Sequence, residues 1–95
     1  MAKYELTILI DDGVTVADML ALEKKIKGHM TIKKRNINGV KRLAYPIRGK
    51  EYAMYLFYVV ETDYKNSVSE LNGELCRDDK VVRFLMVKQD TNHNR

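Results

Sequence analysis

The chain has 95 residues, of which 45% are hydrophobic and 32% are charged, and it carries a formal net charge of +4 at pH 7. This length fits one compact domain, and the mixture of apolar and charged residues excludes a disordered chain and a membrane-spanning segment. The excess of positive charge favours acidic partners.

The first two elements are predicted to be a strand and a helix. Apolar and polar residues alternate over residues 4–10, which is the period of a strand that buries one face. After an Asp-Asp-Gly turn, a helix is predicted from Thr15, which forms a near capping box with Asp18, to about Gly28. The apolar positions at helical spacing in this helix are Val16, Met19, Leu20, Leu22, Ile26 and Met30.

A long hairpin follows the helix. Residues 32–47 are predicted to form a strand that bends at Asn38-Gly39, and Arg48-Gly49-Lys50 is predicted to be the hairpin turn. Residues 51–61 are the most β-prone stretch of the chain, so they are predicted to form a central strand.

The last elements are a second helix and a fourth strand. Asp63 is predicted to cap this helix, and residues 81–88 are predicted to form the strand. Residues at spacings of four, three and four are predicted to face the core from the second helix: Tyr64, Val68, Leu71 and Leu75.

The order β-α-β-β-α-β predicts an α+β, ferredoxin-like fold with a four-stranded antiparallel sheet and both helices on one face. We expect a single domain over residues 1–88, followed by a polar, disordered tail at 89–95. The other face of the sheet is expected to stay open.

Cations are concentrated in the hairpin. Residues 33–50 contain seven lysines and arginines and no aspartate or glutamate, a composition that favours phosphate as a partner. The alternative is a solvated basic strand that binds nothing. The cations are Lys33, Lys34, Arg35, Lys41, Arg42, Arg48 and Lys50.

Both faces of the 51–61 strand are apolar, so this strand alone does not show which of its faces meets the helices. The first strand decides it. If Tyr4, Leu6 and Ile8 face the helices, then Met54, Leu56, Tyr58 and Val60 join them, and Tyr55 and Phe57 lie on the open face. Exposed rings beside cations are typical of base stacking or of a protein partner, although they can also simply pack against long side chains.

Catalysis, metal binding and cofactors have little support in the sequence. His29 and His93 have no nucleophile at a recognisable spacing, and the acidic pairs lie in predicted turns, where they are common. The single cysteine, Cys76, has no thiol partner, which favours a reducing compartment. Since the start of the chain lacks the apolar run of a secretion signal, we expect a cytoplasmic protein. We also expect no enzyme activity, no cofactor, no small-molecule substrate and no membrane partner.

The segment Gly39-Val40-Lys41-Arg42-Leu43-Ala44-Tyr45-Pro46-Ile47, followed by an aromatic strand, resembles the signature of bacterial small-subunit ribosomal protein six. Agreement in order and spacing extends over nearly the whole chain, from Tyr4-Glu5-Leu6 to Val87-Lys88. The resemblance implies a ribosomal assembly protein that binds the central domain of small-subunit rRNA together with ribosomal protein eighteen.

The resemblance also implies site residues. It assigns rRNA contacts to Lys3, Arg42, Arg83 and Lys88 and a stacking or partner role to Tyr45 and Phe57. Charge adds Lys33, Lys34, Arg35 and Lys41 to the rRNA contacts, and exposure adds Tyr55 to the stacking surface. A second small protein could cover the apolar residues expected at open or edge positions, which are Leu9, Leu43, Phe57 and Val59.

Two other interpretations remain open. The strand at 51–61 loosely resembles the aromatic motif of RNA-recognition modules, so Tyr55 and Phe57 could bind single-stranded RNA. This fold also serves interaction and regulatory domains that bind no nucleic acid.

Overall fold

The computed structural model describes residues 2–89 of the chain. Its elements follow the predicted order; the first three strands are slightly longer than predicted, and the fourth has the predicted bounds. They are β1 (Ala2–Asp11), α1 (Val16–Lys27), β2 (Thr31–Ile47), β3 (Lys50–Thr62), α2 (Lys65–Arg77) and β4 (Val81–Lys88). The expected tail begins with Gln89, which still hydrogen-bonds to the backbone of Lys3, while residues 90–95 lie outside the described residues.

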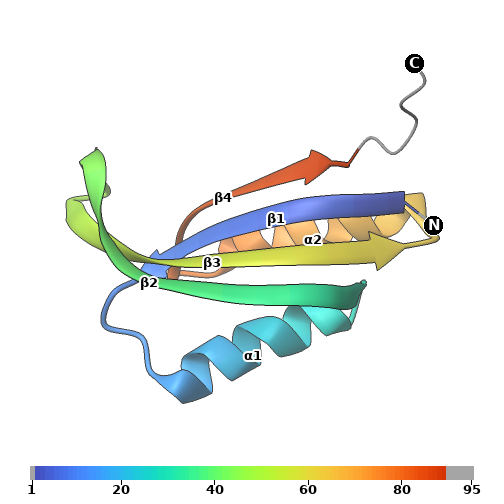
Figure 1. Cartoon of the computed structure of the whole chain (residues 1–95), viewed down its shortest axis with the longest axis horizontal. Helices are drawn as coiled ribbons and strands as arrows, with labels where there is room; N and C mark the ends of the chain where they lie inside the picture. Colours follow the sequence, from blue (N-terminus) through green and yellow to red (C-terminus); the bar gives the residue numbers. More distant parts are fainter. Residues whose placement is uncertain (1, 90–95) are drawn as a thin grey trace.

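The four strands form one antiparallel sheet in the order β2-β3-β1-β4. Both helices lie on the same side of this sheet, and the opposite face is left open (Figure 1). The predicted ferredoxin-like α+β fold is therefore confirmed. The two connections that each carry a helix place β1 and β3 at the centre and leave β2 and β4 as edge strands.

The core lies between the sheet and the helices. Alternate residues of β1 and β3 are fully buried against apolar residues of α1 and α2. The predicted orientation of β3 is confirmed, because Leu56, Tyr58 and Val60 pair in register with buried or partly buried residues of β1 that face the helices. The buried cluster comprises Leu6, Ile8, Ile10, Leu22, Ile26, Met30, Leu56, Tyr58, Val60, Leu71, Leu75 and Val81.

A capping box fixes the start of α1, as predicted. The backbone N–H of Asp18 donates to Thr15 Oγ1 at 3.2 Å, and the N–H of Thr15 donates back to Asp18 Oδ2 at 3.0 Å. Lys80 Nζ, from the turn before β4, lies 3.2 Å from Asp18 Oδ1. The hydrogen bond from Thr15, followed by the contact with Lys80, lowers the pKa of the Asp18 carboxyl below its ordinary value.

This capping box should make stability depend on pH. A carboxyl with a lowered pKa in the folded state stabilises the protein above its unfolded pKa, and that contribution is lost as the pH falls through the folded pKa. Replacing Asp18 by Asn should therefore lower the melting temperature at pH 7 and have less effect near pH 3, which lies below the ordinary pKa of about 3.9. Thermal unfolding of both proteins at the two pH values measures this, and an equal difference at both would contradict it.

The start of α2 differs from the prediction. The N-cap is Tyr64 rather than Asp63, and the Tyr64 side chain makes no capping hydrogen bond. Instead, the N–H of Tyr64 donates to the hydroxyl of Thr62 at 3.1 Å. Tyr64 is 73% exposed, so the predicted core position is wrong for this residue, because an N-cap lies outside the helical repeat. Leu71 and Leu75 are buried and Val68 packs against the core, as predicted.

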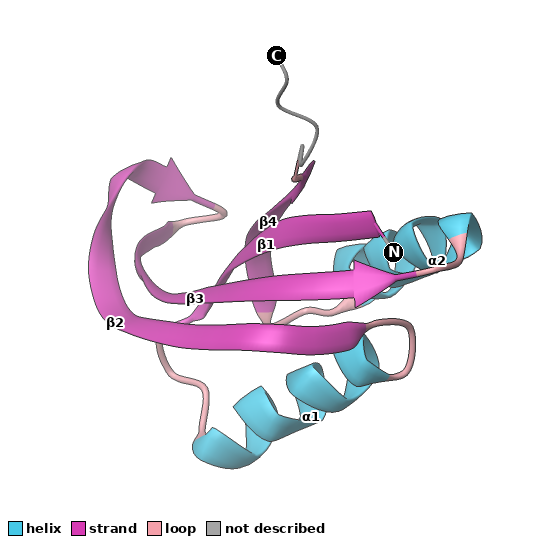
Figure 2. Cartoon of the chain, turned by 45° about the vertical axis from the view of Figure 1, so that its right-hand side comes forward, coloured by secondary structure: helices cyan, strands magenta, loops and turns pink. Residues whose placement is uncertain are grey.

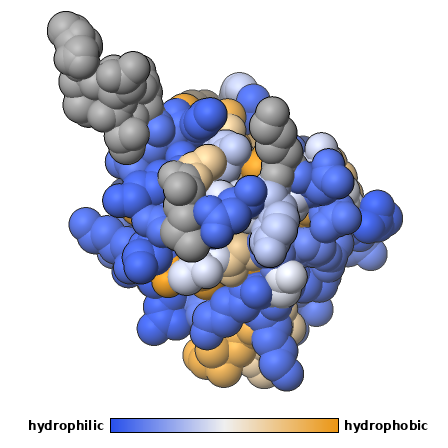
Figure 3. All heavy atoms as spheres, turned by 90° about the vertical axis from the view of Figure 1, so that its right-hand side faces the viewer, coloured by the Kyte–Doolittle hydropathy of each residue, from blue (hydrophilic) through white to orange (hydrophobic). Residues whose placement is uncertain are grey.

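Not every apolar position of α1 reaches the core. Leu22 and Ile26 are buried, whereas Val16 and Leu20 are 66% and 56% exposed. Figure 3 shows an apolar patch at the lower edge of the molecule, on the side where α1 lies in Figure 1. The helix is therefore apolar on part of its outer surface as well as on its inner surface.

The far end of the β2–β3 hairpin leaves the plane of the sheet. The pairing of β2 with β3 shifts register at three places, one of them at the predicted bend, where Gly39 has a φ of 85°. Figure 2 shows the end of β2 curving back over the sheet. The curved end is tied down by the hydroxyl of Tyr45, which accepts a hydrogen bond from Arg83 Nη1 at 3.3 Å, and by an ion pair of 3.0 Å between Lys50 and Asp11.

Candidate nucleic-acid interface

Cations from three of the four strands, β1, β2 and β4, face the open side of the sheet. The strand register decides their direction, because residues directly opposite each other on paired strands point to the same face. Lys34 pairs with Val59, Lys41 pairs with Ala53, and Arg83 pairs with Leu9 of β1. Lys3 pairs with Glu61 on the same face. The predicted residues Lys3, Lys34, Lys41 and Arg83 are thus brought together on one surface.

The predicted aromatic residues lie on the same surface. Tyr55 and Phe57 alternate with the buried residues of β3, so they point away from the helices, and both are half-buried. The Lys41 ammonium lies 5.6 Å from the centre of the Tyr55 ring, a distance at which a cation is attracted to the face of the ring. Tyr45 reaches this side through the curved hairpin end, where its hydroxyl contacts Arg83.

The charge of this surface is only partly balanced. Lys3 Nζ lies 3.5 Å from a carboxylate oxygen of Glu61, an ion pair that is largely exposed on the lysine side. Within residues 2–89, Lys34, Lys41 and Arg83 make no ion pair with an acidic residue. These three exposed cations are therefore available to an anionic partner.

The other predicted contacts point elsewhere. Arg35, Arg42 and Lys88 pair with Tyr58, Tyr52 and Tyr4, all of them positions on the helix side of their strands. Lys33 lies in the register shift between Ile32 and Lys34 and is exposed. The structure thus divides the predicted cations between two faces, which their clustering in the sequence does not reveal.

Arg35 is part of a network beneath the sheet. Its Nη1 lies 3.0 Å and 3.1 Å from the two carboxylate oxygens of Glu23, a buried residue of α1. The hydroxyl of the buried Tyr58 donates to the same carboxylate at 3.1 Å. Burial, and then the Glu23 charge, raise the pKa of the Tyr58 hydroxyl far above its ordinary value, so it remains a neutral donor. The best-defined role of Arg35 is therefore to balance a buried carboxylate.

The sequence reasoning assigned no role to Arg48, although it belongs to the same cation-rich run. In the structure its side chain crosses from the hairpin turn to the start of β4, where Nη1 donates to the carbonyl oxygen of Val81 at 3.2 Å. The signal that could have drawn attention to it is an arginine directly before glycine in a two-residue hairpin turn.

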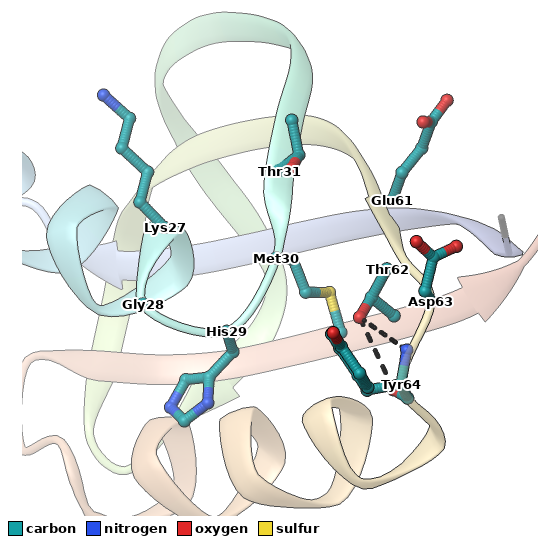
Figure 4. Close-up of a pocket in the computed structure, with 9 residues that line it drawn as sticks. All are labelled: Lys27, Gly28, His29, Met30, Thr31, Glu61, Thr62, Asp63 and Tyr64. Carbon is teal, nitrogen blue, oxygen red and sulfur yellow. Dashed lines mark hydrogen bonds between the residues drawn. The ribbon is translucent and has the colours of Figure 1, made fainter.

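A hollow with a volume of about 220 Å³ lies near His29 and is lined by residues 27–31 and 61–64. Figure 4 shows the residues that line it, with the His29 ring directed toward α2 rather than toward the other side chains. His29 contacts the carboxylates of Glu74 and Glu70 on that helix. The hydrogen bond with His29 lowers the pKa of Glu74. The contact therefore joins the turn after α1 to α2.

Within residues 2–89, no group of three or more His, Cys, Asp or Glu residues is placed to hold a metal ion. Neither helix in this part of the chain has the length and apolar character needed to cross a membrane.

Comparison with known proteins identifies relatives over the whole described domain. A family model described as "Ribosomal protein S6" matches residues 3–88. Small ribosomal subunit protein bS6 of Corynebacterium diphtheriae is 38% identical over 95 residues, covering 95% of this chain and 99% of that protein. The bS6 protein of Corynebacterium aurimucosum is 33% identical over 96 residues, covering 96% of this chain and 99% of that protein.

Among solved structures, the crystal structure of 30S ribosomal protein S6 from Thermotoga maritima superimposes with a TM-score of 0.81. It covers 93% of this chain and 87% of that one at 19% sequence identity, so it supports the fold.

Proposed function

Because the chain belongs to the ribosomal protein S6 family, we propose that it binds the central domain of small-subunit rRNA together with ribosomal protein eighteen. The family is structural and non-enzymatic, and its members are components of the small ribosomal subunit. The finer proposal concerns which RNA and which protein this chain contacts.

The observation that carries the RNA part of the proposal is the open sheet face. Lys34 and Lys41 of β2 and Arg83 of β4 project on this side and make no ion pair within residues 2–89. Cations that replace the counterions around RNA phosphates supply affinity that falls as salt rises. A broad sheet cannot enter the narrow major groove of duplex RNA, so it would read the contour of a backbone or a junction.

The same face supports a protein partner next to the RNA. On β4, Leu85 and Val87 point to the open side and are 63% and 48% exposed. Of the partner residues expected from the sequence, Leu9, Phe57 and Val59 are partly buried, but Leu43 is buried beneath the curved hairpin and offers no surface. We infer that protein eighteen covers the β4 side of the face, where apolar area remains exposed, and leaves the cations to the rRNA.

Binding to a folded central-domain fragment tests the proposal. The affinity of this chain should rise when protein eighteen is added, because the two proteins present one joint basic surface. Fluorescence anisotropy with and without the partner measures the change. Equal affinity in both conditions would contradict the paired binding.

An unstructured RNA of the same length is the control. It should bind more weakly than the folded fragment if shape and phosphate positions select the site. Equally tight binding would instead favour a single-stranded RNA module that uses Tyr55 and Phe57. Failure to bind either RNA, or to co-sediment with small subunits in moderate salt, would leave an interaction domain without a nucleic-acid partner.

A further inference from the structure

The turn of the β2–β3 hairpin contains an arginine in a strained conformation. Ile47 pairs with Lys50, so Arg48 and Gly49 are the two central turn residues, with φ values of 53° and 76°. Such turns favour Gly, Asn or Asp at both positions, because a longer side chain is strained in the left-handed region. A strained residue that persists in a tight turn points to a role for its side chain.

The side chain of Arg48 reaches the start of β4. Its hydrogen bond to the Val81 carbonyl and the bond from Arg83 to Tyr45 join the same two segments from opposite directions. Arg48 and Arg83, which are far apart in sequence, both line one hollow. Each makes one of these hydrogen bonds, and a guanidinium has five N–H groups in a planar fork, so further donors can take an anion.

The hollow has a volume of about 330 Å³, which lies within the range of small-ligand sites. Its remaining walls are apolar or weakly polar, and none of the described residues that line it is acidic. The lining residues are Arg48, Leu75, Cys76, Val81, Val82, Arg83 and Phe84.

We propose that this hollow binds one unpaired nucleotide of an RNA, with its phosphate between Arg48 and Arg83 and its base against the apolar wall. Arginine suits the phosphate because its fork matches two phosphate oxygens at once. Leu75 and Val81 are buried, so the half-buried ring of Phe84 supplies the accessible part of the apolar wall. An aromatic ring suits a flat base, whereas a free phosphate would leave it uncovered. The proposal deepens the proposed function and rests on it, since it names a site that binds the same RNA in addition to the open face.

Nucleotide titrations followed by NMR test the site directly. Adenosine 5′-monophosphate should shift both the guanidinium signals of Arg48 and Arg83 and the methyl signals of Leu75 and Val81. Inorganic phosphate should shift the guanidinium signals alone. If the monophosphate leaves the methyl signals unmoved, or moves signals elsewhere on the protein instead, the proposal is wrong.

An Arg48→Asn variant tests the site in RNA binding. Asparagine tolerates a left-handed φ, so the turn should remain folded while the guanidinium is lost. Affinity for the folded rRNA fragment should fall about tenfold, and the salt slope should fall by about one, as for one lost phosphate contact. The matched control is Arg77→Asn, which removes the same charge from the exposed end of α2 without touching the hollow and should bind within about twofold of the wild type.

Three outcomes separate this proposal from the proposed function. Binding by the wild type with loss only in Arg48→Asn supports both. Unchanged binding in Arg48→Asn overturns the nucleotide site and leaves the rRNA role intact. If the wild type itself does not bind the fragment, the proposed function fails, and the nucleotide titration then decides the site independently.

Discussion

Replacing Glu23 by Ala is expected to destabilise the protein by about 3 kcal/mol, because it removes the shared acceptor of a buried network. The buried hydroxyl of Tyr58 would be left without a hydrogen-bond partner. Arg35 would lose the carboxylate whose two oxygens its Nη1 contacts. The value lies at the low end for breaking a buried ion pair, since the Arg35 side chain is about half exposed and solvent can stabilise it. Urea unfolding followed by circular dichroism measures the loss.

Two variants show whether the network causes that loss. In a Glu23→Ala/Tyr58→Phe double variant no hydroxyl is left unpaired, so the total should be less than the sum of the two single changes. Glu70→Ala is the control on the other helix, where the side chain is 63% exposed, and it should change stability by less than about 1 kcal/mol. Additive losses from the Glu23 and Tyr58 changes would mean that the two residues act independently.

The largest effect on binding is expected when Lys34 and Arg83 are both replaced by Ala. These residues lie on different strands of the open face and make no ion pair within the described part of the chain. If each contacts a phosphate, the slope of log affinity against log salt should become shallower by about two, and affinity should fall about a hundredfold. Anisotropy titrations with the rRNA fragment between about 50 and 200 mM salt measure both quantities.

The matched control removes the same charge from the other side. Lys24 and Lys27 are exposed on α1, so the Lys24→Ala/Lys27→Ala variant keeps the net charge of the first variant but leaves the open face intact. It should retain most of the affinity and the salt slope. Equal losses in the two double variants would show that overall charge, rather than the open face, determines binding.

Arg42→Ala should have less effect than Arg83→Ala, since Arg42 points to the helix side.

The sequence predicts the fold well because most elements carry a clear local signal. Alternation in β1 fixes which residues are buried, and pairing with β3 then forces Tyr55 and Phe57 onto the open face. The capping box of Thr15 and Asp18 locates the start of α1 within one residue. The start of α2 is less well defined, because its cap makes no side-chain hydrogen bond and the preceding Asp63 offers a competing signal.

The candidate site is harder to predict, because it depends on long-range geometry. Lys34 and Arg35 are neighbours in sequence, yet the period of a strand sends one to the open face and the other to Glu23 beneath the sheet. At each of the three register shifts of β2, the alternation between the two faces starts again. The amino-acid composition of β2 does not show where these shifts lie. The contacts of Tyr45 and Arg48 with β4 arise only from the curvature of the hairpin.

The position of β2 at the rim of the sheet affects the protein before it reaches any ribosome. An outer strand of 17 residues presents unpaired backbone groups to which a strand from another molecule could bond, the first step of edge-to-edge aggregation. Repeated lysines and arginines along β2, with a proline and three irregularities in its pairing, oppose such an approach through repulsion and mismatch. The cations of this strand therefore also help to keep newly made copies apart until they are incorporated.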